Sequence, residues 1–148
     1  GLWLHEDDLN PDPKILEGSV RVAVITSSDL HDQYGYAPMR REWIVSASEA
    51  TAERIGPMAE TMATDDTASS LADWAGTHGL KTVVAYQPWV GPVRDGLTQV
   101  EAGLATEGIK LHLIRKPADQ VWVPLATAGF FGFWKKLQKK HPILKDLA

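Results

Sequence analysis

The stretch from Lys81 to Ile114 reads KTVVAYQPWVGPVRDGLTQVEAGLATEGIKLHLI, and it decides the fold that we predict. Its first six residues are mostly β-branched or apolar, which is typical of a buried strand. After a loop, a helix is predicted from about Val93 to Thr106 and ends at Gly108, because glycine commonly terminates helices. Lys110 to Ile114 is a second short strand. The stretch is therefore a strand–helix–strand unit, the building block of a parallel sheet.

A second unit of the same kind lies directly upstream. Asp65-Asp66-Thr67 offers capping side chains for a helix that we predict from Ala68 to His78, with Gly79 as its C-cap. The four residues before each strand also correspond, since His78-Gly79-Leu80-Lys81 resembles Glu107-Gly108-Ile109-Lys110. Repeated units with short connections predict a parallel sheet with helices on both faces. The helix residues available for burial are Leu71, Ala72, Trp74 and Ala75.

The first half of the chain continues the alternation. Leu2 to Leu4 and Val20 to Thr26 are apolar or β-branched runs, and Glu60 to Thr64 is a weaker strand prediction. A polar loop after the second run leads into a helix predicted from Pro38 to Ile55, which Gly56-Pro57 stops. We therefore predict an α/β fold: a Rossmann-like, doubly wound, five-stranded parallel sheet with helices on both faces. Residues that recur at helical spacing in the 38–55 helix are Trp43, Ala47, Ala50 and Arg54.

Length and composition indicate a single domain of ordinary soluble type. The 148 residues are 44% hydrophobic and 23% charged, and no segment approaches the roughly 20 apolar residues of a membrane helix. The first residues show no basic region followed by an apolar run, so we expect no signal peptide. We divide the domain into an α/β body, residues 1–125, and an aromatic and basic helical tail, residues 126–148.

Cysteine content and charge narrow the function further. The chain has no cysteine, which excludes a disulfide framework, thiol catalysis and a thiolate metal site, and fits a reducing, cytoplasmic setting. The formal charge of −4 lacks the basic excess of a domain that grips nucleic-acid phosphates by itself. We expect contact with DNA only indirectly and none with a membrane.

Ligands of such sheets bind outside the carboxyl ends of the strands, near the point at which the strand order reverses. The loops predicted there are residues 5–12, 26–36, 64–67 and 87–95. None contains G-x-G-x-x-G or G-x-x-x-x-G-K-[ST], so we do not expect an ordinary dinucleotide or P-loop NTPase site.

The first of these loops opens with His5, Glu6, Asp7 and Asp8. Clustered carboxylates suit a divalent cation and would repel a phosphate, but a solvated turn that caps the following helix is the interpretation we favour. No spacing such as H-E-x-x-H makes His5 and His31 metal ligands, and we predict no metal site.

The second loop begins Thr26-Ser27-Ser28-Asp29 and could offer hydroxyls and a carboxylate to a ribose or a polar ring edge. Turn formation is the plainer interpretation, and we favour it. A triad of Ser27, His31 and Asp8 lacks a G-x-S-x-G nucleophile motif and is rejected, so we predict no catalytic residue.

Trp89 lies in the loop after the 81–86 strand, where its ring would either stack on a flat ligand or cover the core. Covering the core is the plainer interpretation. Among the other tryptophans, we expect Trp43, Trp74 and Trp122 to be in the core.

The tail from Ala126 to Leu137, ATAGFFGFWKKL, places aromatic residues beside lysines. An amphipathic helix packed on its own sheet is the plain interpretation, and a surface helix that meets a partner domain is the sharper one. The candidate partner-facing residues are Phe130, Phe131, Phe133, Trp134 and Lys135.

Motifs along the chain, in order and spacing, are similar to those of one known family. Phe131-Gly132-Phe133-Trp134-Lys135 resembles the T-P-F-W-K stretch that ends the N-terminal α/β domain of DNA photolyases and cryptochromes. LWLHEDDL at residues 2–9 resembles the family's L-V-W-F-R-R-D-L-R opening. Asn10-Pro11 with Ile15-Leu16 resembles the family's N-P-A-L helix, and residues 40–55 resemble its long helix after the second strand. Residues 82–86, with Pro88 and Arg94-Asp95, resemble the strand and loop that precede the fourth helix. Glu107-Gly108-Ile109 and Val123-Pro124 lie where the family has a helix-ending Gly-Ile and a V-P before the closing F-W-K.

The resemblance implies the antenna half of a larger system. In that family the domain adjoins a helical domain that binds FAD, grips damaged DNA and carries out light-driven electron transfer to a pyrimidine dimer. The residues that bind FAD or relay electrons belong to the helical domain, so we expect no catalysis by this chain alone. The sequence departs from the family where an Arg-Arg pair is replaced by His5-Glu6-Asp7-Asp8, and the segment before Phe130 is shorter. Deazaflavin, folate or flavin pigments are the implied ligands, and the candidate residues are His5, Glu6, Asp8, Thr26, Ser27, Ser28, Asp29 and Trp89.

Two hypotheses follow. The first is an antenna or scaffold domain of a light-dependent DNA-repair system, related to deoxyribodipyrimidine photolyase, either part of a larger enzyme or paired with a separate helical FAD protein. The second is a free-standing nucleotide-binding or interaction domain without photochemistry. We favour the first because the resemblance includes the tail.

Overall fold

The computed structural model describes residues 1–127 and 129–141. The chain divides into two compact units, Gly1–Ile114 and Arg115–Ala148. The division of the domain at residues 125 and 126 stays a prediction. Within the described part of the chain, no helix is long and apolar enough to cross a membrane.

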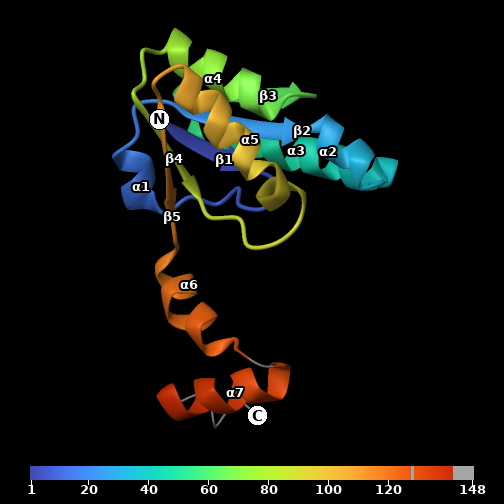
Figure 1. The fold of residues 1–148 in the computed structure, drawn as a ribbon, viewed down its shortest axis with the longest axis vertical. Helices are drawn as coiled ribbons and strands as arrows, with labels where there is room; N and C mark the ends of the chain where they lie inside the picture. Colours follow the sequence, from blue (N-terminus) through green and yellow to red (C-terminus); the bar gives the residue numbers. More distant parts are fainter. Residues whose placement is uncertain (128, 142–148) are drawn as a thin grey trace. The chain divides into compact units, whose positions relative to one another are not determined.

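The first unit is built on one sheet of five parallel strands in the order β3-β2-β1-β4-β5 (Figure 1). This confirms the predicted Rossmann-like, doubly wound α/β fold. Leu2 of β1 pairs with Val22 on one side and with Val84 on the other, so the strand order reverses between β1 and β4. The strands are β1 (Leu2–His5), β2 (Val22–Ser27), β3 (Ala59–Thr64), β4 (Thr82–Tyr86) and β5 (Lys110–Ile114).

The helices of the first unit follow the predicted pattern with one exception. The prediction of a helix at 38–55 is confirmed at both ends, whereas the polar loop predicted before it contains a further short helix, α2. Six residues are too few to display a helical period in the sequence. The helices are α1 (Pro13–Glu17), α2 (Ser28–Gln33), α3 (Pro38–Ile55), α4 (Thr67–Thr77) and α5 (Pro92–Thr106).

The two faces of the sheet carry separate cores because successive strand residues point to opposite faces. Trp3 of β1 packs with Leu71 of α4 and Leu97 of α5, so these two helices cover one face. Leu2 and Leu4 belong to the other core, which includes residues of α1 and α3. All four residues of β1 are buried, as expected for a central strand covered on both faces.

Tryptophan placement was predicted correctly in part. Trp74 is buried in the core, as expected, and Trp122 is half-buried. The prediction for Trp43 was wrong, since its side chain is 70% exposed on α3. The buried face of α3 is formed by Ile44, Ser48 and Thr51. Each of these residues directly follows a residue that the apolar spacing placed on the buried face. Small polar residues occupy most of that buried face, so apolar periodicity did not identify it.

The second unit contains α6 (Pro117–Trp122), a 3-10 turn η1 (Val123–Leu125) and α7 (Phe130–Lys140). In α7, Leu137 is buried, whereas Phe130 and Phe131 are 66% and 79% exposed. The ring of Phe130 stacks on that of Trp134 at a centroid distance of 6.2 Å. The helix therefore presents an aromatic group at its first turn, followed by the lysines of its last turns.

Candidate functional site

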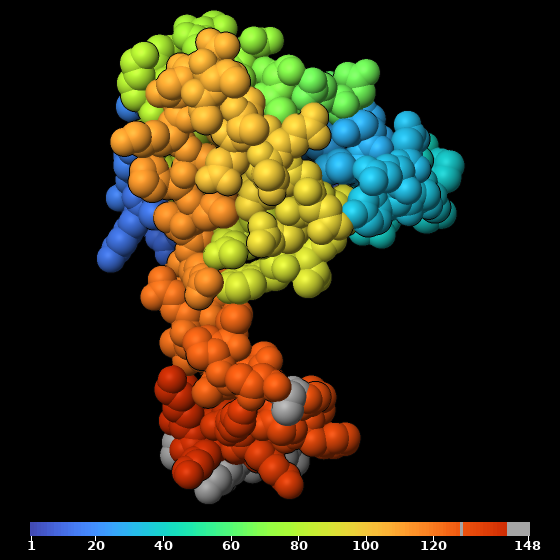
Figure 2. All heavy atoms as spheres, viewed as in Figure 1, coloured from blue at the N-terminus to red at the C-terminus, as the bar shows by residue number. Residues whose placement is uncertain are grey.

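A pocket of about 190 Å³ opens at the carboxyl end of the sheet, on the face that α4 and α5 cover. We call it the strand-end pocket. Its floor is formed by strand residues such as Trp3 and Ile25, and its walls come from α2, the β3–α4 loop and the first half of α5. Figure 2 shows α2 (light blue) against α5 (yellow). The hydroxyl of Tyr34, which follows α2, donates to Asp95 of α5. The pocket therefore lies at the sheet edge where this fold class binds its ligands.

The structure brings four of the predicted site residues together at this pocket. His5 and Glu6 reach it from the end of β1, and Ser27 and Asp29 from the end of β2 and the start of α2. The other four predicted residues do not line it: Asp8, Thr26, Ser28 and Trp89. Thr26 is buried and faces a separate cavity of about 80 Å³ beside α3, and Trp89 is 39% exposed in the loop after β4.

Two buried nitrogens at the pocket have no hydrogen-bond partner. Trp3 and His5 are each 2% exposed, and their rings meet edge to face at 5.5 Å. Nε2 of His5 lies 2.8 Å from the carbonyl oxygen of Tyr86, which can only accept, so in the neutral ring Nε2 carries the hydrogen and Nδ1 is an acceptor. Both His5 Nδ1 and the Trp3 Nε1 donor are unpaired. Because an unpaired buried polar atom is costly, a water molecule or ligand that paired with these two atoms would stabilise the site.

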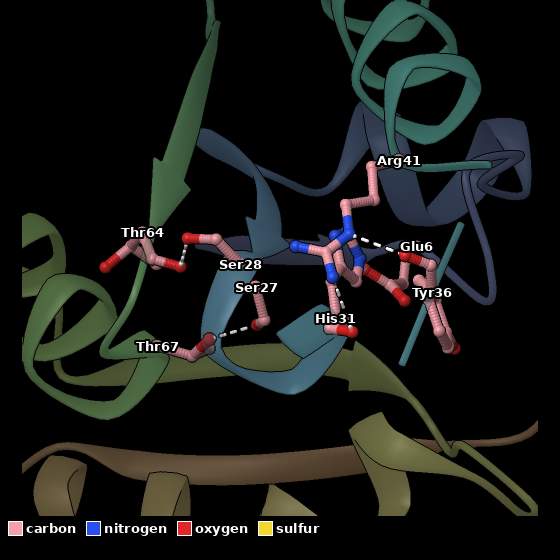
Figure 3. Close-up of polar contacts among 8 residues, drawn as sticks. All are labelled: Glu6, Ser27, Ser28, His31, Tyr36, Arg41, Thr64 and Thr67. Carbon is pink, nitrogen blue, oxygen red and sulfur yellow. Dashed lines mark hydrogen bonds and ion pairs between the residues drawn. The ribbon is translucent and has the colours of Figure 1, made fainter. Parts of the chain in front are cut away.

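A buried carboxylate–histidine contact lies beside the pocket, which Glu6 helps to line (Figure 3). Nε2 of His31 lies 2.6 Å from a carboxylate oxygen of Glu6, and the two side chains are only 3% and 4% exposed. Tyr36 stacks on the His31 ring at 4.8 Å. Arg41 of α3 donates to the Tyr36 carbonyl at 2.8 Å and to the His31 carbonyl at 3.1 Å. The contact thereby ties α2 and the start of α3 to the end of β1.

Hydroxyl groups join the ends of β2 and β3 on another side of the pocket. Ser27 and Thr67 are hydrogen-bonded to each other, and Ser28 donates to the Thr64 carbonyl at 2.9 Å (Figure 3). Thr64 and Ser70 are also hydrogen-bonded, at 2.7 Å. These contacts fix the β3–α4 loop and hold the Ser27 and Thr67 hydroxyls at the pocket wall.

The pocket is acidic. Glu6, Asp29, Asp65 and Asp66 line it, and among the described residues that line it none is Lys or Arg. Asp66 is the N-cap of α4, as its position before the helix predicted, and accepts from the Ser69 backbone at 3.0 Å. Hydrogen bonds from the side chain and then the backbone of Ser69 lower the pKa of Asp66. Its charge is therefore retained at neutral pH.

Within residues 1–127 and 129–141, no group of three His, Asp or Glu side chains is arranged to hold a metal ion. In the loop that was considered for a cation, Glu6 is instead engaged with His31.

Several pocket residues were not among the predicted site residues. Trp3 could have been identified from the sequence, because it lies two positions before His5 on the same strand and therefore on the same face of the sheet. Asp65, Asp66 and Thr67 were interpreted as offering capping side chains; Asp66 is the N-cap of α4, and all three residues also line the pocket.

Comparisons with protein-family models and with curated proteins find no match for this chain.

Proposed function

We propose that the chain is a photolyase-related α/β domain that serves as the antenna or scaffold part of a cytoplasmic, light-dependent DNA-repair system. In this proposal a helical FAD-binding domain or subunit performs the chemistry and contacts DNA. The strand-end pocket is the observation that carries the proposal, since it has the position and the unpaired polar atoms expected of a ligand site.

The pocket suits one ring system better than a whole cofactor. Its volume of about 190 Å³ is below the roughly 300–1,000 Å³ of pockets that enclose drug-sized ligands. Ile25 and Val93 give the pocket apolar surface, while Trp3 and His5 offer a donor and an acceptor. A planar pigment ring inserted edge-on, with the rest of the molecule outside, agrees with this lining.

The second unit supports the partner half of the proposal. Seven of the fifteen Lys and Arg residues lie at or after Arg115, against two of the nineteen Asp and Glu residues. The exposed Phe130 and Phe131 lie on the same helix as four of these lysines. Aromatic residues are enriched at protein interfaces, and the rim of such an interface is polar.

The first experiment is an absorbance scan of the chain purified in dim light. A band in the near ultraviolet or blue, beyond the tryptophan peak, supports a bound pigment. A featureless spectrum, together with no change in flavin fluorescence on addition of riboflavin, would refute the antenna role and leave only the scaffold role.

The scaffold role has its own test. The chain is titrated with the purified FAD-binding helical domain of a DNA photolyase and complex formation is followed by sedimentation velocity. We expect a complex that is lost in the Phe130→Ser, Phe131→Ser double variant. The control is Trp43→Ser, which removes an equally exposed aromatic residue from α3 and should leave the complex intact. Absence of a complex, or equal loss in both variants, would contradict this role.

A nucleotide-binding or interaction domain without photochemistry is the second candidate. It is favoured by the strand order β3-β2-β1-β4-β5, which agrees with the order found in nucleotide-binding doubly wound sheets. Binding of adenosine without any binding of riboflavin would favour this candidate over the first.

A further inference from the structure

The helices that begin at the strand-end pocket differ from those that bind phosphate. A helix N-terminus attracts anions because its first amide groups and its dipole present positive charge. Here Asp66 caps α4, and Asp95 lies in the first turn of α5. Both helix ends therefore already carry a carboxylate of the protein itself.

The other charged side chains of the pocket also disfavour an anionic ligand. Glu6, Asp29 and Asp65 add carboxylates to the lining, and the described lining residues include no Lys or Arg. Beside these carboxylates, His31 is engaged with Glu6 at 2.6 Å, and His5 is part of the lining. A phosphate or carboxylate placed in the pocket would thus meet several like charges and no Lys or Arg side chain among the described lining residues.

At the buried end of the pocket, the unpaired groups of the protein require uncharged polar partners. The Trp3 Nε1–H donor needs an acceptor, and the His5 Nδ1 acceptor needs a donor. The two ring centroids lie only 5.5 Å apart, so the ligand edge that matches this pair in composition carries an acceptor close to an N–H group. Heterocyclic rings such as the flavin pyrimidine edge and adenine have such an edge.

We propose that the strand-end pocket binds an uncharged planar heterocycle through Trp3 and His5, and that its carboxylates select against forms of the ligand that carry a phosphate. This inference rests on the pocket being the ligand site of the proposed function, and it specifies the class of ligand. It separates the chain from nucleotide-binding domains in which phosphate contributes most of the affinity.

The test uses two matched ligand pairs, riboflavin with FMN and adenosine with AMP, each differing only by a phosphate. Dissociation constants for the full chain are measured by flavin fluorescence and by calorimetry at low salt. We expect the phosphate-free member of the pair that binds to be held about tenfold more tightly or better, a difference of the size that a few unscreened charges produce.

A charge-neutralised variant makes the test specific. In Asp29→Asn, Asp65→Asn we expect the phosphate-bearing ligand to gain affinity, so that the two members of the pair differ by less than about threefold. The control is Asp73→Asn, Glu101→Gln, which changes the net charge equally at exposed positions of α4 and α5 that do not line the pocket.

Each outcome has a defined meaning. If FMN binds as tightly as riboflavin, or if the control variant raises FMN affinity as much as the pocket variant, the inference is overturned. If adenosine binds more tightly than AMP and neither flavin binds, the inference stands and the pigment proposal fails. If no member of either pair binds, both are overturned.

Discussion

Removing the carboxylate of Glu6 should lower the free energy of unfolding more than most single substitutions do. The Glu6 carboxylate lies 2.6 Å from His31 Nε2, and the two side chains are 4% and 3% exposed, so water cannot replace a lost partner. A buried polar group that loses its partner costs about 1–3 kcal/mol. We expect Glu6→Ala to lower the free energy of unfolding by about 3 kcal/mol, the upper end of this range, because both side chains are almost fully buried.

A double-mutant cycle separates the contact from the loss of packing. Glu6→Ala, His31→Ala and the double variant should show a coupling energy of about 1–2 kcal/mol, because either single change already removes the interaction. The Arg41–Asp32 ion pair is the internal control, since its side chains are 33% and 73% exposed. Asp32→Ala should cost less than about 1 kcal/mol, as exposed pairs do.

The assay is urea-induced unfolding of the full chain at neutral pH, followed by circular dichroism and tryptophan fluorescence. Coincident transitions from the two probes are required for a single unfolding free energy to be defined. A coupling energy below about 0.5 kcal/mol would refute the argument, because neighbours in contact normally exceed that value. So would an Asp32→Ala variant as unstable as Glu6→Ala.

Three further predictions concern other single positions. Asp66→Ala should lower the free energy of unfolding by about 1 kcal/mol, and Asp66→Asn by much less. Because the pKa of Asp66 in the folded protein lies below its ordinary 3.8, the stability that Asp66 adds over Asn is present above that pH and is lost as the pH falls further. An advantage of Asp66 over Asn that grew in acid would contradict this reasoning. Trp3→Phe should weaken binding of the preferred heterocycle about tenfold, whereas Trp74→Phe, which removes another buried indole with an unpaired N–H, should leave binding unchanged in the same titration. Ser48→Ala should be neutral or stabilise the protein by up to about 1 kcal/mol in thermal unfolding, because the buried Ser48 hydroxyl is unpaired. Thr51→Val should destabilise the protein, because it removes a hydroxyl that donates a hydrogen bond to the Ala47 carbonyl at 2.8 Å.

The sheet and its long helices were predictable because each depends on a local pattern. The β-branched strand at 82–86 and the capped helix that begins after Asp66 show their structure within a few residues. The face of α3 was not predictable in this way, since Ser48 and Thr51 are small polar residues that a packing surface selects for size. Helix α2 was also missed, because its stability depends on contacts with distant residues such as Glu6 and Asp95.

The candidate site was predictable in location but not in content. Strand ends in a doubly wound sheet indicate which loops to examine, and His5, Glu6, Ser27 and Asp29 come from two of them. Whether a loop residue lines a pocket depends on the direction of its side chain, and no local pattern gave that direction for Ser28. The unpaired Trp3 nitrogen is a property of the tertiary structure alone, since it depends on what fails to approach it.

Charge is divided unevenly between the two units. Residues 1–114 hold eight Lys and Arg against seventeen Asp and Glu, whereas the remainder holds seven against two. A strongly acidic surface opposes contact with a phosphate backbone, and a basic segment favours it. If the chain is attracted to DNA or to an acidic protein surface, we therefore expect the residues after Ile114 to provide that attraction. The proposed small-molecule site lies instead in the acidic unit, and the carboxylates that line it are the reason for proposing a ligand without a phosphate.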